Sequence, residues 1–171
     1  MRELSLDDLP FVHSMLGDPE VMRYYPRVLD RDASMAWIER QRARYADEGH
    51  GLWLLEERET GTPIGQAGLV MQELRAFPHP RYPEIGWLLH RAFWKRGYAT
   101  EAATRIRRYA ENMLGYPEVI SLVRPENEPS QAVARRIGMH VIGETIFASL
   151  PHLVFGARRA HLPSPEQAPH E

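Results

Sequence analysis

Apolar residues recur with a helical period in the first third of the chain. One face of the first predicted helix carries four of them: Leu9, Val12, Met15 and Leu16. We expect Ser5 to cap this helix and Gly17 to end it. A short strand is predicted before it at Arg2–Leu4, and a second helix, ended by Gly49, is predicted over residues 31–48.

The hydrophobic period becomes that of strands after residue 50. Residues 51–57 and 63–71 are predicted to form a hairpin around the turn sequence ETGT. A Pro-rich loop, AFPHPRYP at 76–83, follows, and the next predicted strand is EIGWLLH at 84–90. The whole connection, residues 72–83, is longer than a hairpin turn needs. It is either a spacer or a wall of the binding site for a substrate.

Helices and strands alternate through the rest of the chain. The predicted elements are a helix over 98–114, a strand over 119–123, a helix over 128–137 with Asn127 as its N-cap, and strands over 139–147 and 151–159. This order of elements is typical of an α/β protein with a mixed sheet and helices packed on its faces.

Composition narrows the class of protein. The chain has 171 residues, 43% of them hydrophobic, which suits one domain over residues 1–160. The Pro-rich tail at 161–171 is predicted to be disordered. The net charge of −2 argues against nucleic-acid binding, and the absence of cysteine excludes a thiol nucleophile. No signal core or membrane-length apolar run is present, so we expect a cytoplasmic protein.

The histidines do not have the spacing of metal ligands. Neither H-E-x-x-H nor H-x₃-H occurs among the eight, so no metal is expected.

The segment WKRGYATEA, residues 94–102, joins a predicted strand to a predicted helix. The first amides of a helix lack intrahelical partners and attract anions, and Gly97 lets a ligand approach the backbone closely. One acidic residue, Glu101, lies among six basic ones: Arg91, Lys95, Arg96, Arg105, Arg107 and Arg108. The segment is therefore either a site for a di- or polyphosphate or a basic, solvated helix face behind a tight turn.

Two segments resemble the GNAT superfamily of acyl-CoA N-acyltransferases, and within it the RimJ/RimL-like branch. They are EIGWLLHRAFWKRGYATEAATRIRRYAENMLG at 84–115 and VISLVRPENEPSQAVARRIGM at 119–139. The start of the chain, LSLDDLPFVHSMLGDPEVMRYYP, is similar to the start of that branch as well. The resemblance covers about residues 2–160 and implies a GNAT-like fold, in which strands 84–90 and 119–123 splay apart around the thioester of acetyl-CoA.

The resemblance also implies which residues bind acetyl-CoA as the co-substrate. The superfamily's pyrophosphate loop, Q/R-x-x-G-x-G/A, falls on residues 94–99. The pyrophosphate would then meet the backbone amides of Lys95, Arg96, Gly97, Tyr98, Ala99 and Thr100. Strand residues Trp87, Leu88 and Leu89 would pair with the pantetheine arm as an added strand. Asn127 and Ser130 match the family's N-x-x-S, with Asn127 at the pantetheine amides and Ser130 near the sulfur.

The chemistry of acyl transfer suggests roles for particular residues. An amine is mostly protonated at pH 7, so a base is useful, and Glu84 is the candidate. Ser130 is the candidate that hydrogen-bonds or protonates the departing thiolate, although it can equally bond the backbone at a helix start. Tyr24 and Tyr25 border the acceptor site by resemblance, or serve packing.

One departure from the family pattern keeps a non-catalytic alternative open. Ala134 stands where many members carry a tyrosine proposed as the general acid. The expected function is direct acetyl transfer to a primary amine, on a protein N-terminus or a small molecule, by a monomer or homodimer. The alternatives are a catalytically idle acyl-CoA-binding module and a phosphate binder without preference for CoA.

Overall fold

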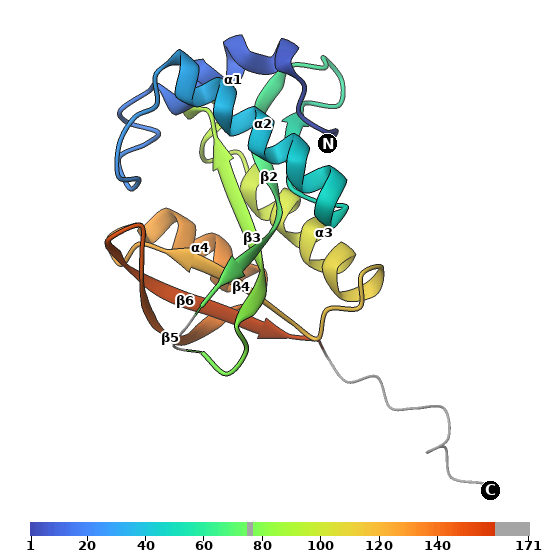
Figure 1. Ribbon diagram of the computed structural model, residues 1–171, viewed down its shortest axis with the longest axis vertical. Helices are drawn as coiled ribbons and strands as arrows, with labels where there is room; N and C mark the ends of the chain where they lie inside the picture. The colour runs from blue at the N-terminus through green and yellow to red at the C-terminus, as the bar shows by residue number, and fades with distance from the viewer. Residues whose placement is uncertain (75–76, 160–171) are drawn as a thin grey trace, which may run out of the picture.

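The computed structural model describes residues 1–74 and 77–159, which form a six-stranded mixed sheet with helices on both faces (Figure 1). The helices and strands are α1 (Leu9–Leu16), α2 (Arg31–Glu48), β1 (Leu52–Glu56), β2 (Pro63–Glu73), β3 (Arg81–Leu89), α3 (Tyr98–Asn112), β4 (Glu118–Val123), α4 (Glu128–Arg136), β5 (His140–Phe147) and β6 (Leu150–Arg158). Short 3₁₀ turns at Leu6–Asp8 and Arg91–Phe93 precede α1 and α3. The predicted α/β fold is confirmed.

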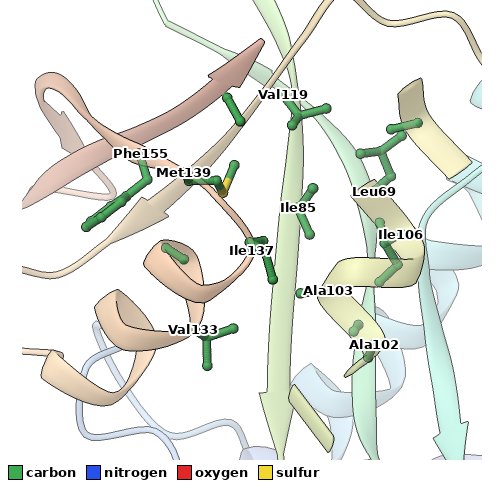
Figure 2. Close-up of a cluster of buried hydrophobic side chains, with 14 of the residues drawn as sticks. Leu69, Ile85, Ala102, Ala103, Ile106, Val119, Val133, Ile137, Met139 and Phe155 are labelled. Atoms are coloured by element: carbon green, nitrogen blue, oxygen red, sulfur yellow. The ribbon is translucent and has the colours of Figure 1, made fainter. Parts of the chain in front are cut away.

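The sheet has the strand order β1-β2-β3-β4-β6-β5. Four of its strand pairs are antiparallel, and β3 and β4 are parallel. Its two faces carry different helices. Leu54 and Leu88 pack with α1 and α2, whereas Ile85 and Phe155 pack with α3 and α4. Figure 2 shows the cluster on the α3–α4 face, where Ile106 of α3 and Val133 of α4 lie on either side of β3 in the view.

The sheet opens between β3 and β4. A continuous nine-pair ladder joins β3 to β2, but β3 and β4 are in register at one pair only, Glu84 and Ile120. Beyond this pair, hydrogen bonds that involve side chains take the place of the backbone ladder. The Ser121 hydroxyl donates to the carbonyl of Ile85 at 2.7 Å, and the Leu122 amide donates to the Glu84 carboxylate at 3.3 Å. The expected splay of these two strands is therefore present.

Most predicted helix boundaries are confirmed within two residues. Gly17 ends α1, and Gly49 ends α2 in the left-handed conformation with φ 72°. The expectation that Ser5 caps α1 directly is wrong, because the 3₁₀ turn lies between them and Asp8 occupies the N-cap position.

Two strand predictions need correction, and one prediction is outside the structure. Arg2–Leu4 is not a strand: Arg2 makes one isolated bridge to Leu54 before the chain turns. β3 begins at Arg81, three residues before the predicted start at 84. Pro83 favoured a loop in the sequence because a proline cannot donate a ladder hydrogen bond. The predicted tail at 161–171 lies outside the described residues. None of the described helices has the length and apolarity to cross a membrane.

Candidate functional site

A cavity of about 140 Å³ lies where β3 and β4 part. Its walls come from five segments: the α1–α2 loop with Tyr24 and Tyr25, β3 with Glu84 and Trp87, β4 and its end with Ser121 and Arg124, the start of α4 with Asn127 and Ser130, and the β5–β6 hairpin with Phe147 and His152. In Figure 1 the α1–α2 loop (blue) hangs above the β5–β6 turn (red), on the side of the molecule where these residues lie. The cavity thus brings together six predicted site residues: Glu84, Trp87, Ser130, Asn127, Tyr24 and Tyr25.

Glu84 has an acidity suited to proton exchange near neutral pH. Withdrawal of its carboxyl group from water raises its pKa from 4.5 to about 7, against the opposing effects of the Leu122 amide and the positive charge of Arg44. The amide of Leu122 is free to bond the carboxylate because the β3–β4 ladder has already ended. The splay of the sheet therefore both exposes Glu84 to the cavity and orients it.

Tyr25 faces the same space as Glu84. The residue is 39% exposed overall, but burial of its hydroxyl raises the pKa of Tyr25 to about 12, and the nearby charge of Glu84 adds to the rise. The hydroxyl is therefore protonated at neutral pH and able to donate a hydrogen bond. Tyr24 is held differently, because its hydroxyl accepts from Arg23, whose guanidinium also lies over its ring.

The start of α4 presents two further predicted residues. The amide oxygen of Asn127 accepts from the backbone amide of Ser130 at 3.2 Å, so the predicted N-cap is confirmed. Both residues line the cavity. Ala134, one turn further on, is fully buried among the apolar residues of the α3–α4 face, so this helix brings no phenol to the site.

The turn before α3 leaves its backbone open to a ligand. Gly97 has φ 86°, and a Cβ at this position would have no atom within 4 Å, so the space beside the backbone is open. Lys95 has a left-handed φ of 61°. The first amide of α3 that bonds to a carbonyl is that of Glu101, to Gly97 at 3.0 Å, which leaves the preceding amides directed out of the helix end.

Side chains around this turn hold it against the rest of the fold. The Trp94 indole donates to the carbonyl of Leu89 at 2.8 Å, and the Tyr98 hydroxyl donates to Glu57 at 2.7 Å. Arg96 lies over the ring of Phe93. The turn is therefore fixed by contacts that leave its amides uncovered, as a phosphate site requires.

The three strand residues predicted to bind the cofactor differ in what they present. Trp87 lines the cavity, whereas Leu88 packs towards α1 and α2 and Leu89 is buried towards α3. Since this part of β3 has no ladder to β4, its backbone is the part left for an extended ligand.

Sequence reasoning missed several residues that line the cavity, including Ser121, Arg124, Phe147 and His152. Phe147 and His152 come from the β5–β6 hairpin, whereas the Pro-rich connection 72–83, one of whose readings was a binding-site wall, contributes no lining residue within its described part. The sequence places His152 in the alternating strand predicted over 151–159. The spacing of the histidines bears only on metal binding and gives no sign of this position. In the described part of the chain no three His, Asp or Glu residues are grouped to hold a metal.

The matches to known proteins identify the class. Residues 1–140 match the acetyltransferase (GNAT) domain family. The chain is 33% identical over 126 residues to the uncharacterised protein YkkB of Bacillus subtilis (strain 168), covering 74% of this chain and 72% of YkkB. Its fold matches an acetyltransferase of Agrobacterium tumefaciens str. C58 with TM-score 0.75 and 30% identity, over 92% and 89% of the two chains.

The chain therefore belongs to the GNAT acetyltransferase family, as its resemblance predicted. The same fold occurs in RimL, a ribosomal L7/L12 alpha-N-protein acetyltransferase solved with coenzyme A, with TM-score 0.74 and 14% identity over 92% of each chain. Acetyl-CoA is the co-substrate of this family, and the exposed amides of the turn before α3 suit its phosphates.

Proposed function

We propose that this protein is an acetyl-CoA-dependent N-acetyltransferase that transfers the acetyl group directly to a primary amine. The observation that carries the proposal is Glu84: a carboxyl group with a pKa of about 7 at the point where the central strands part, inside a cavity. A base with a pKa near the working pH is suited to take a proton from an ammonium ion.

Separate groups of residues would bind the co-substrate and act on the amine. The amides of residues 95–100 would hold the pyrophosphate, the backbone of 87–89 the pantetheine arm, and Asn127 its amide groups. When bound, acetyl-CoA supplies the thioester carbonyl and the thiolate leaving group. Glu84 would accept a proton from the amine, and the Ser130 hydroxyl would donate to the departing sulfur. With no cysteine in the chain, a thiol acyl-enzyme is excluded.

The cavity supports an acceptor that inserts little more than its amine end. Its volume of about 140 Å³ is below the roughly 300–1,000 Å³ of pockets that enclose a whole drug-sized ligand. A small primary amine or the first residue of a peptide fits this description. Tyr24 and Tyr25 would contact that end from the α1–α2 loop, opposite β3.

The competing function is binding of acyl-CoA without turnover, which the absence of a tyrosine at Ala134 favours. A thiol-release assay distinguishes the two functions, with acetyl-CoA and a panel of butylamine, kanamycin and an alanyl tripeptide. Amine-dependent thiol release, with the acetylated product seen by mass spectrometry, is expected. Tight CoA binding by calorimetry without turnover of any amine would establish the idle module instead. Equal competition by ATP and CoA would favour a general phosphate binder.

A further inference from the structure

Proton counting shows that the acceptor nitrogen loses two protons in the proposed reaction. In R–NH₃⁺ + CH₃CO–S–CoA → R–NH–COCH₃ + HS–CoA + H⁺, the C–S bond breaks, the C–N bond forms and the nitrogen loses two protons. One ends on the sulfur and the other in water. Glu84 can hold only one of them at a time. A second proton acceptor beside the amine would remove this restriction.

His152 lies on the same face of the sheet as Glu84. On β3, Ile85 and Trp87 pack towards α3 and α4, so Glu84 points to the opposite face. On β6, Leu153 and Phe155 pack towards α3 and α4, so His152 also points to the opposite face. Both residues line the one cavity, which Tyr25 closes from the α1–α2 loop.

Asn127 and Ser130 approach this cavity from α4, on the other face of the sheet. The splay therefore separates the side from which the co-substrate is expected from the side that carries Glu84 and His152. This arrangement assigns His152 to the amine rather than to the co-substrate.

The hydrogen bonding of His152 determines which nitrogen can accept a proton. Its Nδ1 lies 2.9 Å from the carbonyl of Leu150, and because a carbonyl only accepts, Nδ1 carries the hydrogen. Nε2 then carries the lone pair, and it makes no hydrogen bond within residues 1–74 and 77–159. The Phe147 ring packs edge-on against the imidazole, with 5.7 Å between the ring centroids, and helps to fix its orientation.

We propose, on the basis of the function proposed above, that His152 is a second catalytic base whose Nε2 accepts a proton from the acceptor amine after Glu84 has taken the first. One of the two protons reaches the departing sulfur by way of the Ser130 hydroxyl, and the other passes from His152 to water. No oxidant, metal or further reactant is needed, and the balance is that of the equation above.

The charges around His152 agree with this role. Burial lowers its pKa below 6.5 and the positive charge of Arg124 lowers it further, while the carbonyl of Leu150 and the charge of Glu126 oppose the shift. Glu84, Tyr24, Tyr25 and Arg124 are the other titratable groups that line the cavity with it, and its partner on β5, Thr145, does not titrate. His152 is therefore neutral at pH 7 and ready to accept a proton.

The test compares His152→Gln and His152→Ala with the parent, using acetyl-CoA and the best amine of the panel. We expect kcat to fall about 10- to 100-fold in both variants, with the amine KM and the CoA dissociation constant within about threefold of the parent. In the parent, log kcat should fall on the acid side with two ionisations. Both variants should retain only the one that belongs to Glu84. Millimolar imidazole should partly restore His152→Ala.

His140→Gln is the matched control, because His140 is an exposed histidine on the same hairpin and does not line the cavity. Parent-like kcat and pH dependence in both His152 variants would overturn the second base while leaving the N-acetyltransferase intact. A lower kcat with an unchanged acid limb and no rescue by imidazole would reduce His152 to a structural residue and overturn it too. If the parent binds CoA but acetylates no amine, the proposed function fails first and this inference fails with it.

Discussion

The two halves of the candidate site are built from different parts of the chain. Before α3, the turn around Gly97 presents backbone amides, and its basic side chains Lys95 and Arg96 are exposed. In the cavity between β3 and β4, titratable side chains converge from separate elements, and Glu84, Tyr25 and His152 all have pKa values shifted by burial. One half therefore depends on a backbone conformation and the other on the identity of side chains.

This difference predicts how each half tolerates substitution. A turn that binds through its amides should accept new side chains that point outward and reject any change that closes the space beside the backbone. The cavity should respond to the loss of a single functional group, because each group has its own role in proton transfer.

Gly97→Glu should weaken CoA binding by more than about 100-fold. It forces a side chain into the left-handed region, fills open space and places a negative charge where phosphate is expected. Isothermal titration calorimetry with CoA measures the loss. Gly115→Glu is the matched control, since Gly115 has φ 73° and equally open surroundings at the other end of α3. Retained affinity in Gly97→Glu would show that phosphate does not bind at this turn.

Glu84→Gln should lower kcat by about 100-fold while leaving CoA affinity unchanged, because the amide keeps the shape of the side chain but accepts no proton. In the parent, kcat should rise with pH through about 7 as Glu84 loses its proton. The variant should lack this rise. A variant that keeps both the rate and the pH profile of the parent would exclude Glu84 as the base.

Glu84→Gln should raise the stability of the fold above pH 7, although it lowers kcat. The folded pKa of Glu84 is raised from 4.5 to about 7, so the folded state favours the protonated form. Its contribution to stability is full below pH 4.5 and is lost as the pH rises through 7. Above pH 7, Glu84→Gln should therefore be more stable than the parent, by up to about 3 kcal/mol. Urea denaturation at pH 4.5 and pH 8 measures the difference.

The sequence predicted the turn better than the cavity for a physical reason. The turn is local: Gly97, the basic run and the start of a helix are contiguous, so pattern and helix-end chemistry were enough to predict the glycine turn and the start of α3. Local signals also located Asn127 as an N-cap. The splay of β3 and β4 and the position of Glu84 in it came from family resemblance, because the pairing of two distant strands leaves no local signal.

The cavity wall shows where sequence reasoning fails. The Pro-rich connection 72–83 was a candidate wall because its prolines and its length are visible in the sequence, yet its described residues do not line the cavity. Phe147 and His152 line the cavity instead, because β6 lies beside β4 in the sheet. That neighbourhood depends on strand order, and strand order is a tertiary property.

Tyr25→Phe tests whether the α1–α2 loop contacts the acceptor. Removing the hydroxyl leaves the ring in place and deletes one hydrogen-bonding group, so the amine KM should rise about 3- to 10-fold with kcat within about threefold. Tyr109→Phe, the same chemical change on α3 beside Trp53, serves as the control. An unchanged KM in Tyr25→Phe would assign Tyr25 to packing.

Substitution of Lys95 should have the smallest effect, although Lys95 is the only lysine in the chain. Its side chain is exposed, and an exposed charge pair contributes about 0.2–1 kcal/mol, so Lys95→Ala should weaken CoA binding by no more than about fivefold. Lys95→Gly should behave alike, because glycine adopts the φ of 61° without strain and keeps the amide in place. Calorimetry at low and moderate salt measures both variants. A loss above tenfold in both would mean that the ammonium group, rather than the backbone, holds the phosphate, and the contrast between the two halves of the site would fail.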